Sequence, residues 1–138
     1  MATPEHAQDL NDLFAEEIEA AIRYLHLAVT VKGLDRLLVQ KVLLENMRET
    51  LEHAQTIANK IVQLGGVPSL DLRLKLAPRK SSGAEAIRTA IAFEQAALDA
   101  YRELLDKIRG DVPLEEFVRA QVDLESQHVA ELSLLVEE

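Results

Sequence analysis

Two glutamates, Glu17 and Glu94, each stand in the middle of an apolar helical stripe. No other feature of the sequence limits the possible folds as strongly. At a turn of about 100° per residue, the apolar side chains of the neighbouring turns share a helix face with each glutamate. Each glutamate is followed seven residues later by a tyrosine, Tyr24 or Tyr101. A buried ionised carboxylate is so costly that a cation, a hydrogen-bond network or a proton must compensate it. The pattern therefore predicts a helical core built around carboxylates, with a buried metal site as the first interpretation.

Glycines and prolines divide the chain into four predicted helices, and period-two alternation typical of a sheet is scarce. The helices are expected over Thr3 to about Lys32, Asp35 to Leu64, Ser82 to Gly110, and Pro113 nearly to Glu138. A capping-box spacing at Ser82 to Glu85 marks the start of the third.

The links between these helices predict the topology. Short links around Gly33 and Gly110 force antiparallel neighbours. Segment 65–81 is long: about 17 residues reach roughly 55 Å when extended, and a helix of about 30 residues measures roughly 45 Å. We therefore expect an all-α, antiparallel four-helix bundle of two hairpins with a long crossover between helices 2 and 3, forming a single domain over 1–138.

Composition limits the classes of partner. The chain has 138 residues, 48% of them hydrophobic, which suffices for one core. Its net charge is −9, with 24 acidic and 15 basic residues, so nucleic acid is not an expected partner. Without cysteine, disulfides and thiolate metal sites are excluded. No apolar run approaches about 18 residues and the N-terminus is too polar for a secretory signal, so we expect a cytoplasmic protein without membrane contact.

Histidines join the carboxylates at one level of the bundle. Glu125 and His128 form a Glu-x-x-His step on the core face of the fourth helix, and His53 faces the core from the second. Measured from the hairpin turns, these positions match the depth of Glu17 and Glu94. Carboxylate oxygen with imidazole nitrogen suits iron or manganese, so the predicted metal ligands are Glu17, His53, Glu94, Glu125 and His128. The alternative is a polar core without metal, in which Tyr101 and Tyr24 satisfy Glu17 and Glu94.

These residues resemble the ferritin superfamily, and bacterioferritins most. The matching features are Leu10 to Leu13 leading to Glu17 and Tyr24, His53-Ala54, the Gly65 to Pro68 turn, Glu94, and Glu125 with His128. The resemblance covers nearly the whole chain. It implies a di-iron centre that oxidises Fe(II) with O2 or peroxide, with Glu17 and Glu94 as terminal ligands, Glu125 as a bridge and both histidines as nitrogen ligands. Iron storage or detoxification would follow.

The chain also departs from that family. Where the second helix should carry a bridging glutamate it has Thr50, and Glu49 lies about 100° away and would have to swing round to replace it. Three glutamates leave one positive charge of two ferrous ions uncompensated, so we expect the second of two iron ions to bind weakly, or a degenerate site to hold only one. Haem is not expected, because the family's ligand methionine would fall at Leu51. From this sequence we expect no counterpart of the short fifth helix of bacterioferritin shells.

Two other functions stay open. One is a ferritin-like dimetal oxygenase that acts on an organic substrate, and the other is a catalytically silent bundle that serves assembly only. Whether the chain is an enzyme is left open, with ferroxidase activity as the implied chemistry. Surplus apolar residues on the first hairpin, such as Leu25 and Leu38, predict a homodimer, which could build a larger assembly.

Overall fold

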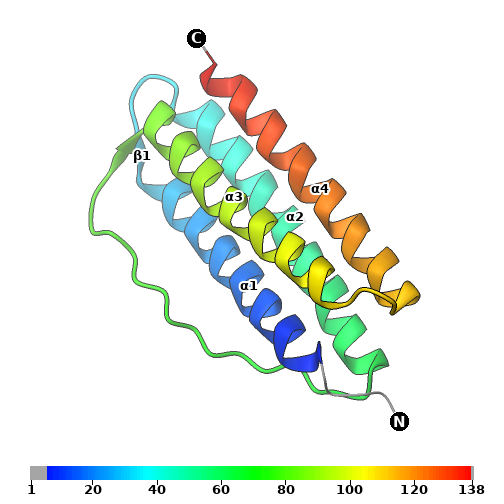
Figure 1. Cartoon of the computed structure of the whole chain (residues 1–138). Helices are drawn as coiled ribbons and strands as arrows, with labels where there is room; N and C mark the ends of the chain where they lie inside the picture. Colours follow the sequence, from blue (N-terminus) through cyan, green and yellow to red (C-terminus); the bar gives the residue numbers. More distant parts are fainter. Residues whose placement is uncertain (1–5, 138) are drawn as a thin grey trace.

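The computed structural model describes residues 6–137 and has four long helices. These are α1 (Ala7–Thr30), α2 (Arg36–Gln63), α3 (Gly83–Lys107) and α4 (Val112–Val136). Helices α1 and α2 form one antiparallel hairpin, and α3 and α4 form the other (Figure 1). The predicted all-α four-helix bundle is therefore confirmed. No helix in the described part of the chain has the length and apolar content needed to cross a membrane.

The predicted helix ends are close, and each shift has a local cause. Gly33 and Gly110 make the hairpin turns with φ of 115° and 96°, a region that favours glycine. At the start of α3, Ser82 and Glu85 form the predicted capping box, with both bonds 3.2 Å long. Helix α4 begins at Val112 rather than Pro113, because the Asp111 side chain caps it and proline is tolerated in the first turn. The expected start at Thr3 lies outside the described residues.

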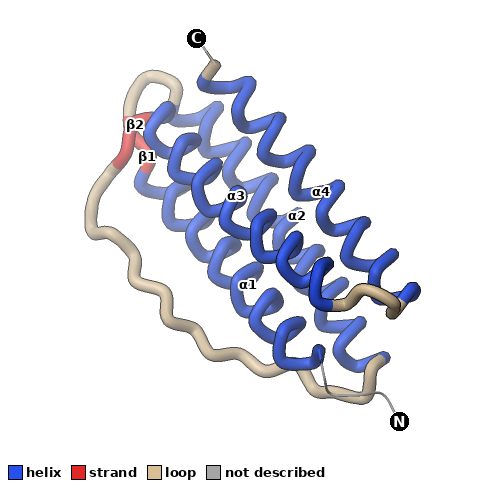
Figure 2. The backbone as a smooth tube through the Cα atoms, viewed as in Figure 1, coloured by secondary structure: helices blue, strands red, loops and turns tan. Residues whose placement is uncertain are grey.

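The long crossover runs beside α1 from one end of the bundle to the other, as predicted (Figure 2). Two of its backbone N–H groups donate to side chains of α1: that of Ser69 to Asn11 Oδ1 and that of Arg73 to Glu19 Oε1, both at 2.8 Å. It ends in β2 (Ser81–Ser82), which pairs in parallel with β1 (Val31–Lys32) just after α1. This short pairing was not predicted, and it fixes where α3 begins.

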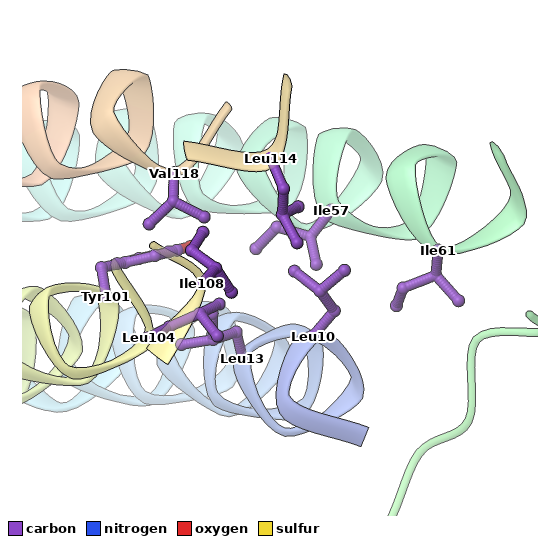
Figure 3. Close-up of a cluster of buried hydrophobic side chains, with 9 residues drawn as sticks. All are labelled: Leu10, Leu13, Ile57, Ile61, Tyr101, Leu104, Ile108, Leu114 and Val118. Carbon is purple, nitrogen blue, oxygen red and sulfur yellow. The ribbon is translucent and has the colours of Figure 1, made fainter. Parts of the chain in front are cut away.

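The apolar core consists of two clusters of buried side chains, each drawn from all four helices or their immediate ends. One lies where α1 and α4 begin, and Figure 3 shows its members: Leu10, Leu13, Ile57, Ile61, Tyr101, Leu104, Ile108, Leu114 and Val118. The other lies toward the opposite end and contains Tyr24, Leu27, Ala28, Val31, Leu43, Ala86, Ile87, Ala90 and Leu132. Between the two, the bundle buries Glu17, Glu94 and Glu125, so the polar centre has apolar packing on both sides.

Candidate metal centre

All five residues that the sequence predicts as ligands meet in the middle of the bundle. Helix α1 contributes Glu17, α2 contributes His53, α3 contributes Glu94, and α4 contributes both Glu125 and His128. The three glutamates are 1 to 2% exposed. The core-facing phase of the helices explains this burial, because each residue sits on the apolar stripe of its helix.

The five side chains form two groups that could each hold a cation. Glu17, His53 and Glu125 make one group, and Glu94, Glu125 and His128 make the other. In each group the candidate ligand atoms lie within 4.8 Å of one another. Glu125 belongs to both groups, so it could supply a ligand atom to each of them.

Both histidines turn Nδ1 toward the carboxylates. His53 Nδ1 is 3.4 Å from Glu125 Oε1 and 3.9 Å from Glu17 Oε2. His128 Nδ1 is 3.1 Å from Glu94 Oε2. The two rings stack with their centroids 5.3 Å apart. One imidazole nitrogen is thereby presented to each group of acidic oxygens.

The tyrosines donate a hydrogen bond to only one of the buried carboxylates. Tyr101 donates its hydroxyl proton to Glu17 Oε1 at 2.9 Å, as the metal-free alternative requires. The matching bond from Tyr24 to Glu94 is absent, and the Tyr24 hydroxyl has no partner among the described residues. Glu17 Oε2 and Glu125 Oε2 are also buried without a hydrogen bond from those residues. Buried oxygens of this kind are expensive unless something pairs with them, so the donor set fits a cation.

Without a cation, protons on Glu125 and His128 reduce the repulsion among the buried carboxylates. Burial, with the charges of Glu125 and Glu94, raises the pKa of Glu17 well above 4.5. Burial and Glu94 raise the pKa of Glu125 to about 9. Burial also acts to raise the pKa of Glu94, but the hydrogen bond from His128 brings it below 4.5. That bond to Glu94 raises the pKa of His128 to about 9 against the effect of burial. A bound cation would take the place of these protons.

Thr50 occupies a buried position beside the centre, and the neighbouring Glu49 contacts one of the predicted ligands from outside. Thr50 is 1% exposed and its hydroxyl has no hydrogen-bond partner in the described chain. Glu49 belongs to neither ligand group. It reaches instead to the outer nitrogen of His128, with Glu49 Oε2 2.6 Å from His128 Nε2. Sequence reasoning considered Glu49 only as a replacement ligand and missed this contact, because helix phase alone does not show how far a long exposed side chain reaches.

A sequence model of the ferritin family, described as a ferritin-like domain, matches residues 7–138. The chain belongs to the ferritin-like family. Its fold is similar to that of a ferritin-like, diiron-carboxylate protein from Bacillus anthracis str. Ames, with a TM-score of 0.82, 27% identity and 96% of each chain covered. It is also similar to a dodecameric thioferritin, the bacterioferritin-related protein of Bacteroides fragilis, with a TM-score of 0.81 and 28% identity over 92% of this chain and 81% of that one. No curated protein matches the chain.

Proposed function

We propose that this ferritin-like protein binds iron at the carboxylate and histidine centre and oxidises Fe(II) with O2 or peroxide, in iron storage or detoxification. The observation that carries the proposal is the convergence of five carboxylate and imidazole side chains on a buried centre in which Glu125 is common to both groups. The similarity to a diiron-carboxylate protein supports iron as the metal. Two ions are proposed, with unequal affinities.

The residues have distinct tasks in this proposal. Glu17 and Glu94 bind at the two outer positions, Glu125 joins them, and the histidines supply neutral nitrogen ligands through Nδ1. Because the pKa of Glu125 is raised to about 9, this carboxyl group holds a proton at neutral pH when no cation is present, and Fe(II) binding releases that proton. In the overall reaction two Fe(II) lose one electron each, and O2 takes both electrons with two protons to give hydrogen peroxide.

A hollow between α2 and α4 reaches the histidines from the surface. Carboxylates line it beside His53 and His128, and they come from Glu49, Glu52 and Glu131. Acidic walls raise the local concentration of cations, which favours Fe(II) as substrate. An organic substrate of the alternative oxygenase would need a mainly apolar cavity, and this lining favours the iron-oxidising function over it.

The test is Fe(II) oxidation by the metal-free protein under air, with O2 consumption and ferric absorbance followed together. We expect Fe(II) to oxidise faster than in buffer, with a fast phase whose size matches the number of sites. Glu125→Ala is the matched control, because it removes the side chain common to both groups and puts a good helix former in its place. Oxidation no faster than in buffer, or equally fast with the Glu125→Ala protein, would contradict the function and favour a bundle that serves assembly only.

We also propose that the chain forms a homodimer through the first hairpin. The first hairpin exposes several large apolar side chains, including Leu25 of α1 at 46% and Leu38 of α2 at 68%. Exposed apolar surface that is contiguous is typical of protein–protein contacts. The similarity to a dodecameric protein supports a larger assembly. Light scattering of the purified protein tests this, because a monomer at micromolar concentration would contradict it.

A further inference from the structure

His128 is held by a carboxylate on each of its two ring nitrogens. Nδ1 faces Glu94 Oε2 at 3.1 Å inside the bundle, and Nε2 faces Glu49 Oε2 at 2.6 Å near the surface. The His128 side chain is 10% exposed, whereas that of Glu49 is 52% exposed. The second contact therefore crosses the boundary between the buried centre and the hollow.

The two ring nitrogens of a histidine have different functions when it binds a metal. The nitrogen that binds must offer a lone pair, and the other then carries the proton and needs an acceptor. A carboxylate that accepts this proton fixes the tautomer, orients the ring and makes the ligand more basic. In this chain Nδ1 belongs on the metal side, since it faces Glu94, and Nε2 is the nitrogen that Glu49 contacts.

The other histidine lacks such a partner. His53 contacts Glu17 and Glu125 through Nδ1, and no carboxylate within the described residues contacts its Nε2. Glu49 also stands next to Thr50, the position at which the first hairpin lacks a buried carboxylate. With the three buried glutamates, Glu49 would bring the negative charges near the centre to four, the number that balances two ferrous ions.

We propose that Glu49 is a positioning residue of the metal centre: it accepts the Nε2 proton of His128 and so holds the Nδ1 lone pair toward the group formed with Glu94 and Glu125. The inference rests on the proposed metal centre and adds a function for a residue that is itself no ligand. Glu49 thereby supplies the negative charge that position 50 lacks, and it does so through its contact with His128 and not as a metal ligand.

The test is a titration of the metal-free protein with Co(II), followed by the visible absorbance of the bound ion, for wild type and three variants. We expect Glu49→Ala to weaken binding by about 10-fold to 100-fold while the number of ions bound stays the same. Glu49→Gln retains an acceptor for the Nε2 proton without the charge, so its affinity should lie between those of wild type and Glu49→Ala. Glu52→Ala is the matched control, because Glu52 lines the same hollow without contacting His128.

A second measurement reports the contact itself. In the Zn(II)-loaded, ¹⁵N-labelled wild type, the Nε2–H of His128 should be visible by NMR and protected from exchange, and Glu49→Ala should lose that protection. Unchanged affinity and protection in Glu49→Ala, an equal loss of affinity in Glu52→Ala, or loss of one bound ion would each overturn the role of Glu49. If the wild type binds no Co(II), Zn(II) or Fe(II), the metal centre itself is wrong.

Discussion

The two hairpins place similar polar side chains at corresponding positions, but only the second has two carboxylates and a histidine there. In the second, Glu94 on α3 faces Glu125 and His128 on α4, and all three belong to one ligand group. In the first, Glu17 on α1 faces His53 on α2, and the place that corresponds to Glu125 is taken by Thr50, as the spacing before each histidine shows. The first hairpin must therefore borrow Glu125 from the second to complete its group.

A near-symmetric bundle can thus present two unequal groups of candidate ligands. Tyrosine bonding is unequal as well, since Tyr101 bonds Glu17 and Tyr24 has no partner among the described residues. We expect the group with Glu94 to bind the first ion more tightly, because its His128 is supported by Glu49.

The largest effect should come from removing Glu125, which both groups use. We expect Glu125→Ala to weaken the binding of both ions by more than about 100-fold, beyond the loss that an outer partner of a ligand produces. Glu17→Ala should weaken one ion by a similar factor and spare the other. Isothermal titration with Fe(II) under argon measures both; two equally affected sites in Glu17→Ala would show that the groups are not separate.

Completing the first hairpin should remove the inequality. Thr50→Glu adds a fourth buried carboxylate, so we expect the weaker ion to bind at least about 10-fold more tightly, or about 1.4 kcal/mol. Without metal the same variant should melt at a lower temperature than wild type, because the added carboxylate is buried among others. Thr50→Gln, similar in size but neutral, should show no such gain. Equal affinities in the Thr50→Glu and Thr50→Gln proteins would contradict the charge argument.

The metal-free protein should lose stability as pH rises from 6 to 9. Glu125 and His128 both have folded pKa values raised to about 9, so the folded protein holds more protons than the unfolded chain in this window. Stability then falls with rising pH. Thermal melting at several pH values checks the sign. Saturating metal should abolish this loss of stability, because the side chains that bind it are already deprotonated. A melting temperature of the metal-free protein that rises over this pH window would contradict the protonation of Glu125 and His128 in the folded state.

A smaller effect separates the two tyrosines. Tyr101→Phe leaves Glu17 Oε1 without its donor and should cost about 1–3 kcal/mol in the free energy of unfolding. Tyr24→Phe removes a hydroxyl that has no partner in the described chain, so stability should stay the same or rise slightly. Urea denaturation of both variants is a direct check. An equal loss of unfolding free energy in the two variants would mean that Tyr24 and Tyr101 make equivalent hydrogen bonds.

Much of this architecture is predictable from the sequence. Helix phase and the short glycine turns predict the bundle, and they place Glu17, Glu94 and Glu125 in one layer, because a helix of known rise converts residue number into depth. The capping box at Ser82 is a local signal and is confirmed. Whether the five predicted residues act as ligands stays a prediction.

The remainder depends on contacts that sequence spacing does not encode. The parallel pairing of Val31 and Lys32 with Ser81 and Ser82 joins segments about fifty residues apart, and it arises only once the crossover lies along α1. The contact of Glu49 with His128 likewise depends on the reach of a flexible side chain across two helices. Such long-range pairs follow from packing, not from periodicity.

The central claim is that the buried carboxylates and histidines together hold metal ions. A crystal structure of the protein soaked anaerobically in Fe(II), with anomalous diffraction data on both sides of the iron absorption edge, tests it most directly. We expect two anomalous peaks, one among Glu17, His53 and Glu125 and one among Glu94, Glu125 and His128, with Glu125 contacting both. Anomalous peaks confined to the surface, with none beside these residues, would contradict it.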